Sequence, residues 1–452
     1  MQATDILYKE CIAANRFGLA ERRVRRIANL GGADVWVTNQ LRKNPATLNF
    51  PTFDTTGPLS PSAPGAPNHN EIHQNNFFIR LQYLSKSTTP VLDRLAMFWA
   101  NHFTVSGTLN TVRRFIVPFE FEAIRPNLTG TFDKLCLSAV THVGMLVYLG
   151  NHVSTGPNSI AGKKRQQGLN ENLGREVLEL HTVGREGGYT QADVEGLSKV
   201  LSGWGLASND NTVAEFVPAR HEPGPLTVMG KVYPDVGKDQ LGLVIKDLSQ
   251  RRATADFIAL KLCRYMVRNS LQPQNQMVRA VADTFFQTKG DLLQVYNTLF
   301  SHPQAWEPLE THAQNVRTPD DWVVAIHRVF EFGDVTDPLN PSRKLIKQYQ
   351  LNGVLGQEFG RSPGPDGWSN DPSIWITPDT MFNKVKFATA LAEFVTNDSA
   401  EDAEGIADMR SRISAFMPSP DSLPSRRVIS QASSNEQAAT LALLAPEFLR
   451  RA

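Results

Sequence analysis

Two glutamates, an arginine and an asparagine share one face of a helix predicted within residues 168–184, GLNENLGREVLELHTVG. The apolar residues of this stretch fall at helical spacing. The polar residues follow one another at offsets of 0, 3, 4 and 7, which places their side chains together; they are Asn172, Arg175, Glu176 and Glu179. His181 points roughly the opposite way, close to the helix end. Two carboxylates that project in one direction are groups that could act as acid and base.

This pair favours a hydrolase that acts on a glycan. Glycosidases use two carboxylates about 5 to 10 Å apart whose pKa values differ, and residues three apart on a helix can meet the short end of that range. Glu176 and Glu179 would then be the acid and the base or nucleophile. Arg175 would tune the pair, and Asn172 would bind substrate hydroxyls. Further substrate-binding candidates are Asn101, Trp99, Trp204 and His221.

A metal-dependent enzyme is the first alternative. The ligand types present are His102, Glu176 and Glu179, with His181 in reserve, and they suit iron, manganese or zinc. The central motif reads Glu-x-x-Glu-x-His, whereas ferritin-like di-iron sites use Glu-x-x-His on two helices. The sequence holds no HExxH motif. No cofactor is therefore predicted, and a divalent metal belongs to this alternative only.

A non-catalytic role is the second alternative. Arg175, Glu176 and Glu179 could form a buried ion network that locks helices together in a binding or structural protein, and such networks shift pKa values without any chemistry. The simplest interpretation of the same face is a solvated surface with an Arg175–Glu179 pair, worth a few tenths of a kcal/mol. The hypotheses differ in what the loss of Glu176 would change: turnover in an enzyme, stability in a network.

The elements that would position these residues are mostly helices. Periodicity predicts them at residues 3–14, 18–30, 33–41, 71–85, 91–103, 115–124, 132–139, 253–268, 276–287, 292–299, 320–330, 378–395, 403–416 and 436–444. Thr190-Gln-Ala-Asp193 is a capping box with Asp in place of Glu, and it opens a helix that runs to Leu201. Apolar and β-branched residues at 206–236, separated by Gly and Pro, predict a small β-hairpin.

The predicted architecture is mainly α, a multi-helix array with a small β-hairpin insertion and long loops. The loops are expected at residues 51–70, 151–167 and 333–375. Three parts are predicted within one compact unit: a helical part at 1–205 that carries the candidate site, a β-containing insertion at 206–248, and a helical part at 249–452.

Composition excludes several classes of protein. The 452 residues carry a formal net charge of +1, so no electrostatic feature predicts binding to nucleic acid or to an anionic membrane. No apolar run is long enough to span a bilayer. The three cysteines form no zinc or haem motif. The first residues lack the apolar run of a signal peptide, so a cytoplasmic protein is expected; the alternative is a periplasmic or secreted protein whose leader is missing.

Several motifs, in order along the chain, resemble those of the bacterial domain-of-unknown-function 1800 family. They are Asn15-Arg16-Phe17-Gly18, Phe98-Trp99-Ala100-Asn101-His102-Phe103, the central stretch 170–184, Gly188-Tyr189-Thr190-Gln191, Ser202-Gly203-Trp204, Phe257-Ile258-Ala259-Leu260-Lys261-Leu262, Gly367-Trp368 and Ala445-Pro446-Glu447-Phe448-Leu449-Arg450. The resemblance covers about residues 12–450, and the central motif is the most specific part of it.

The resemblance implies no activity, because the family is named for the lack of one. It implies an exported protein, often encoded beside a domain-of-unknown-function 1501 protein that looks like a sulfatase-type hydrolase, so such a protein is one expected partner. A polysaccharide or oligosaccharide is the other. The sequence departs from the family pattern at Gly150, where an Asp is usual, and at Val143, where a Pro is common. If that Asp belongs to the family's site, the site is altered here.

Overall fold

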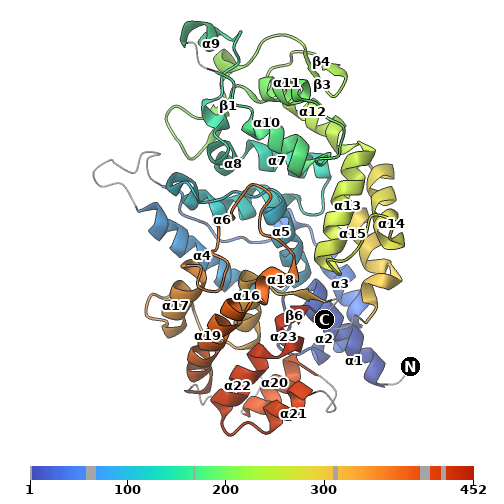
Figure 1. Ribbon diagram of the computed structural model, residues 1–452, viewed down its shortest axis with the longest axis vertical. Coiled ribbons are helices and arrows are strands. Elements are labelled where there is room, and N and C mark those ends of the chain that lie inside the picture. Colours follow the sequence, from blue (N-terminus) through green and yellow to red (C-terminus); the bar gives the residue numbers. More distant parts are fainter. Residues whose placement is uncertain are drawn as a thin grey trace.

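The computed structural model describes residues 3–56, 68–165, 168–308, 314–397, 408–418 and 424–451. It is mainly helical, as predicted, and its strands form three two-stranded sheets within the described residues. Every described helix is too short or too polar to span a bilayer. Figure 1 shows α7–α12 and β1–β4 at one end of the molecule, α19–α23 at the opposite end, and α5, α16 and α18 between them.

The helices follow one another along the whole chain. The first group is α1 (Ala3–Ile12), α2 (Arg25–Asn29), α3 (Ala33–Leu41), α4 (His69–Lys86), α5 (Pro90–His102), α6 (Ile116–Phe119), α7 (Phe132–Thr141) and α8 (Val143–Tyr148). The second group is α9 (Ile160–Arg165), α10 (Asn172–Glu176), α11 (Gln191–Leu201), α12 (Asp239–Ser249), α13 (Arg252–Met266), α14 (Gln276–Gln287) and α15 (Leu292–Ser301). The third group is α16 (Pro319–Val329), α17 (Pro341–Ile346), α18 (Pro372–Trp375), α19 (Pro378–Asn397), α20 (Met409–Phe416), α21 (Pro424–Ser430), α22 (Asn435–Leu444) and α23 (Pro446–Leu449).

Shorter helical turns interrupt this series. Turns of the 3-10 type are η2 (Pro45–Thr47), η3 (Asn110–Phe115), η5 (Arg125–Asn127), η6 (Asn151–Val153), η8 (Pro218–Arg220) and η9 (Pro303–Trp306). Wide π-helical turns are η1 (Ala13–Phe17), η4 (Glu120–Ile124), η7 (Val177–His181) and η11 (Lys347–Leu351). Single π turns are uncommon and often lie at functional sites. Two of them, η1 and η7, fall within motifs that the sequence analysis singled out.

The β structure lies where the sequence predicted it, but it consists of two hairpins. β1 (Trp204–Leu206) pairs antiparallel with β2 (Ala214–Phe216), and β3 (Leu226–Val228) pairs antiparallel with β4 (Lys231–Tyr233). A third pair joins distant parts of the chain, because β5 (Asn315–Val316) pairs with β6 (Arg450–Arg451). This last pairing fixes the end of the described chain beside α16.

Local predictions hold where local chemistry decides. The capping box is present, since Thr190 and Asp193 exchange hydrogen bonds at the start of α11. The helix predicted at 18–30 is wrong in extent: only Arg25–Asn29 is α-helical. Ala20 has a φ of +72°, a left-handed conformation that no helix accommodates. Of the helix predicted at 403–416, residues 403–407 lie outside the described part of the chain.

Two apolar cores meet at the middle of the molecule. One contains buried residues between Ile12 and Ala305, and the other joins α4 and the segment around Leu19 to residues between Trp322 and Leu449. The helices α5 and α16 are buried on nearly all sides. Both carry buried charges as well as apolar residues, and one charge of each helix pairs with one of the other.

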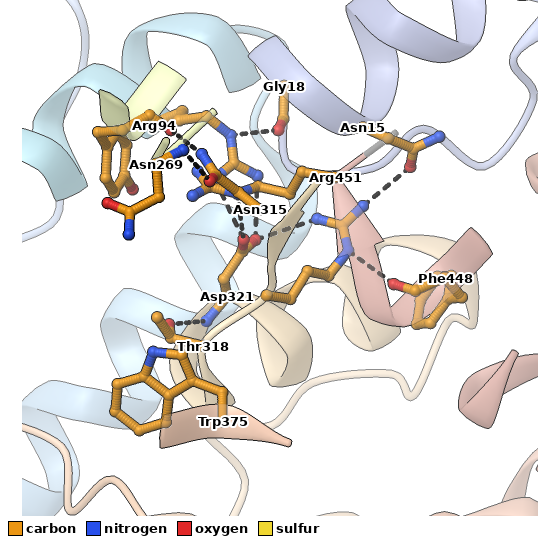
Figure 2. Close-up of polar contacts among 12 residues, drawn as sticks. Asn15, Gly18, Arg94, Asn269, Asn315, Thr318, Asp321, Trp375, Phe448 and Arg451 are labelled. Atoms are coloured by element: carbon orange, nitrogen blue, oxygen red, sulfur yellow. Dashed lines mark hydrogen bonds and ion pairs between the residues drawn. The ribbon is translucent and has the colours of Figure 1, made fainter. Parts of the chain in front are cut away.

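Arg94 on α5 and Asp321 on α16 form a bidentate ion pair inside the protein, with N–O distances of 3.1 and 3.0 Å (Figure 2). The Nε–H of Arg94 donates to the carbonyl of Gly18. Asp321 also accepts from Arg317 at 3.1 Å. The neighbouring residue Asp320 forms a second bidentate pair, with Arg80 of α4. Charges buried in this way stabilise a fold only when their partners are complete.

This ion pair generates a prediction about stability. Asp321→Asn removes the carboxylate that pairs with Arg94 and leaves a buried cation uncompensated. We expect the free energy of unfolding at pH 7 to fall by about 3 to 5 kcal/mol. Urea denaturation followed by circular dichroism measures it. The matched control is Asp256→Asn, which breaks an exposed pair with Arg252 and should cost less than about 1 kcal/mol.

The pH dependence has a definite sign. Burial raises the pKa of Asp321, but Arg94, Arg317 and Arg451 together outweigh burial and lower it to about 2. The pKa of an Asp in an unfolded chain is about 3.9, so the unfolded state takes up the proton first as the pH falls. The stability that Asp321 contributes is complete above about pH 4 and is lost toward pH 2. Equal acid profiles for the wild type and Asp321→Asn would contradict this assignment.

Candidate functional site

The central motif folds as predicted up to Glu176 and then widens. α10 continues directly into the π turn η7. The hydroxyl group of Thr182, the residue after η7, donates to the carbonyl of Val177 at 2.7 Å. The amide of Gly184 donates to the carbonyl of Leu178 and ends the helix. A π turn contains more residues than an α turn, so it rotates the residues after Glu176 relative to an ideal helix. His181, the last residue of η7, is buried.

Glu179 lies among cations at the edge of the site. Its carboxylate is 3.9 Å from Arg175 and 4.0 Å from Arg185, and it accepts a hydrogen bond from Tyr189. The Arg175–Glu179 pair is the i,i+4 pair that the sequence predicts. The Glu179 side chain is 20% exposed and that of Arg175 is 38% exposed. The pair is therefore partly solvated and does not form a buried network.

Glu176 has a different environment from Glu179, although it is only three residues away. Its side chain is half-buried, and burial, followed by the charge of Glu179, raises the pKa of its carboxyl group. Arg185 and Arg175 oppose this shift without cancelling it. The phenol of Tyr148 lies near enough for Glu176 to contribute to raising its pKa to about 12, although burial is the larger cause.

Behind this pair lie two buried histidines and a lysine. The ring of His102, on α5, donates through Nε2 to the carbonyl of His181 at 3.1 Å. Burial lowers the pKa of His181 to about 3, with the cation of Lys261 as the second cause. Burial, Lys261 and His181 likewise hold the pKa of His102 well below its usual range. Both imidazoles are therefore neutral at pH 7.

Asp366 interacts electrostatically with both Glu176 and Lys261. Its carboxylate is among the charges that raise the pKa values of Glu176 and Tyr148, and it opposes the lowering of the pKa of Lys261. Asp366 begins the Trp368 loop, which we define as residues 366–370. Asn101 holds this loop in place, because it accepts from the amide of Trp368 at 2.8 Å and donates to the carbonyl of Trp368 at 2.9 Å.

Gly367 is required for this contact. Its φ is +81°, and a Cβ atom there would lie 2.5 Å from the carbonyl oxygen of Asn101. Only a glycine allows the loop to approach α5 so closely. The Gly367-Trp368 motif therefore positions Asp366, and both amide atoms of Asn101 are used to hold the loop.

The other predicted site residues are dispersed. Asn172 is exposed at the start of α10. The indole of Trp99 is 0% exposed and donates to the hydroxyl of Tyr296, so it offers no face to a substrate. Trp204 lies in the first hairpin against Phe216. His221 is buried in the segment after that hairpin, where Nδ1 bonds the carbonyl of Ser202.

The alternative metal ligands are not gathered into one group. Among the described residues, no cluster of three or more His, Cys, Asp or Glu side chains could hold a metal ion. His102 and His181 lie close together, with ring centroids 6.1 Å apart, and each has a buried Nδ1 without a hydrogen-bond partner. Two imidazoles fall short of the three protein ligands that a catalytic zinc site uses.

The position of the family Asp lies beside the site. Gly150 has a φ of +69° and follows Tyr148 by two residues. The side-chain amide of Asn170 donates to the carbonyls of Leu149 and Gly150, and a Cβ atom at Gly150 would lie 2.8 Å from that amide nitrogen. Asp tolerates this backbone conformation better than most residues. An Asp here would therefore require a small movement of Asn170.

Sequence reasoning missed Tyr148, Lys261 and Asp366. Lys261 was present in the motif 257–262 as its single charged residue among apolar ones, and Asp366 directly precedes Gly367-Trp368. The lone charge in this apolar motif was the signal that could have found Lys261. Its proximity to His181 could not be found in this way, because the two residues are far apart in the chain and no regular pattern connects them.

The burial of Lys261 predicts that the stability of the protein rises with pH in the alkaline range. Burial lowers the pKa of the Lys261 amine to about 8, whereas an unfolded lysine titrates near about 10.4. Between these values the folded state has released the proton and the unfolded state retains it, so stability rises with pH. Lys261→Met should remove this rise and increase stability at pH 7 by at most about 3 kcal/mol. Thermal unfolding from pH 7 to 10.5 measures both effects.

Lys246→Met is the control for this experiment. Lys246 is exposed on α12, and its loss should leave the alkaline profile of the wild type unchanged. A Lys261→Met variant that is less stable than the wild type at pH 7, with the same alkaline rise, would contradict a buried and destabilising amine.

Comparison with known proteins agrees with the motifs. The family model described as "Protein of unknown function (DUF1800)" matches residues 12–450. No curated protein and no solved structure matches the chain. The match spans nearly the whole chain and includes Asn101, the central motif, Lys261 and the Trp368 loop. This chain belongs to the DUF1800 family, for which no function is known.

Proposed function

We propose that this protein is a hydrolase of glycosidic bonds, with Glu176 as the general acid and Glu179 as the base or nucleophile. The observation that carries the proposal is that two carboxylates, three residues apart on one helical face, lie in unlike environments. Burial keeps Glu176 protonated to a higher pH, while Arg175 and Arg185 surround Glu179 with positive charge. Paired carboxyl groups whose environments separate their pKa values are how glycosidases assign acid and base.

The groups around the pair support this proposal. Asn172, Arg185 and Asp366 are exposed around the pair, so a polymer could reach the pair from solvent and find hydrogen-bonding groups there. Tyr189, whose phenol donates to Glu179, would hold that carboxylate in one orientation. Asp366 also contributes to the raised pKa of Glu176, and Lys261 interacts with Asp366.

The non-catalytic alternative makes a different prediction for the same variant. If Arg175, Glu176 and Glu179 only locked helices together, the loss of Glu176 would lower stability strongly. The partial exposure of Arg175 and Glu179 argues for a small effect, since exposed pairs contribute about 0 to 1 kcal/mol.

The test uses Glu176→Gln and Glu179→Gln with a panel of polysaccharides. General acid–base groups contribute about 100- to 10,000-fold, so each variant should release reducing sugar at least 100-fold more slowly than the wild type. The activity of the wild type should fall as the pH rises through the raised pKa of Glu176, because the acid must be protonated. The midpoint of thermal unfolding should change little.

Glu186→Gln provides the control, because Glu186 is exposed in the loop that follows the motif and lies outside the pair. Its rate should equal that of the wild type. Full activity in Glu176→Gln, or no release of sugar from any polysaccharide by the wild type, would overturn the proposal. A large loss of stability in Glu176→Gln would favour the structural alternative.

A further inference from the structure

A cavity of about 120 Å³ lies where α5, α16, the segment 357–370 and the end of the described chain meet. Neither Glu176 nor Glu179 lines it. Its apolar walls include Met97, Val105 and Phe359, and Trp368 also lines it. A cavity of about 150 Å³ can hold one benzene molecule, so this one suits a ligand of roughly five non-hydrogen atoms.

Its polar wall carries a cation with incomplete bonding. Arg451 lines the cavity and is 3% exposed, yet its Nε and one terminal nitrogen have no hydrogen-bond partner. A carboxylate oxygen of Asp321 lies 4.0 Å from the Nε of Arg451, beyond hydrogen-bonding distance. The guanidinium also lies 4.7 Å from the ring centre of Tyr265. A buried arginine normally completes its donors with an acceptor, and here the acceptor is missing.

The charges around Asp321 explain why Arg451 lacks a partner. Three arginines, Arg94, Arg317 and Arg451, converge on this single carboxylate. Arg94 and Arg317 donate to its oxygens at 3.0 to 3.1 Å, and Arg451 is left at 4.0 Å. Figure 2 shows Arg94 and Arg451 beside Asp321. The group thus carries excess positive charge, and the excess is located at the cavity.

The other carboxylates that line the cavity do not cancel this excess locally. Both oxygens of Asp320 accept from Arg80 at 3.1 Å. Glu120 accepts from Arg80 at 2.6 Å and from Arg125. These oxygens are directed at their own arginines, which leaves Arg451 as the cavity's unsatisfied donor.

We propose that this cavity binds a small organic monocarboxylate, whose carboxylate pairs with the unpartnered nitrogens of Arg451 and whose short apolar chain lies against Met97, Val105 and Phe359. Arginine binds carboxylates through paired, charge-assisted hydrogen bonds. An inorganic anion would satisfy Arg451 but would leave the apolar walls unused. This site is separate from the glutamate pair, and the proposal does not depend on the hydrolase activity.

Sodium propionate is the probe, with propionamide as its neutral isostere, at constant ionic strength. A ligand that binds only the folded state raises the unfolding midpoint. Propionate should raise it in a saturable way and propionamide should not. Arg451→Gln should weaken propionate binding at least tenfold, since a hydrogen bond to a charged group contributes about 1.5 to 3 kcal/mol. Arg451→Lys, which keeps the charge, should retain part of the affinity.

Two further variants keep the test decisive if Arg451→Gln fails to fold. Ala100→Leu fills the cavity from α5 and leaves Arg451 in place, so it should abolish binding. Arg450→Gln removes the adjacent arginine, which does not line the cavity, and should bind propionate as the wild type does. Glu176→Gln should also bind normally.

Three results would overturn the proposal. The first is no propionate-dependent shift in the wild type, which would mean a cavity that holds water only. The second is equal shifts with propionamide, or unchanged binding in Arg451→Gln or Ala100→Leu. The third is equal or tighter binding of chloride or phosphate, which would mean a site for inorganic anions.

Discussion

The bidentate pair between Arg94 and Asp321 is the constraint on which the rest of the structure depends. It joins α5 to α16 between the two apolar cores, and its partners are 227 residues apart in the chain. Removing two charges from water costs several kcal/mol per ion, so the surrounding chain has to supply donors and acceptors. Gly18 provides a carbonyl to Arg94, and Arg317 provides a further donor to Asp321. The N-terminal segment and the last helices are held together in this way.

The sequence predicted what short-range chemistry decides. The capping box at Thr190, the helical class and the β structure after Trp204 all follow from residues within a few positions of one another. The ion network does not, because its members belong to α4, α5, η4 and α16 and no local period connects them. The sequence suggested a buried ion network only at Arg175, as one alternative to the hydrolase hypothesis. Arg175 lies in the most specific motif of the sequence, but in the fold its side chain is more exposed than that of Arg94.

The candidate site was predictable only in the part that lies within one short stretch of sequence. Glu176 and Glu179 share a predicted helix, so their proximity could be inferred from spacing. Lys261 and Asp366 reach the site from α13 and from a loop, so only tertiary structure could show them. The π turn adds a further cause, because it changes the directions of the residues after Glu176 and helical periodicity does not predict it.

Helix α5 sets the distances between all these features. Arg94 and Asn101 are seven residues apart, which returns the chain to nearly the same face about 10 Å further along the axis. Arg94 can therefore pair with Asp321 while Asn101 holds the Trp368 loop, and the cavity lies where these two contacts enclose it. His102 follows Asn101 and is turned by about 100° toward His181. Helix α5 thus lines the cavity, holds the loop that carries Asp366 and places His102 against the carbonyl of His181.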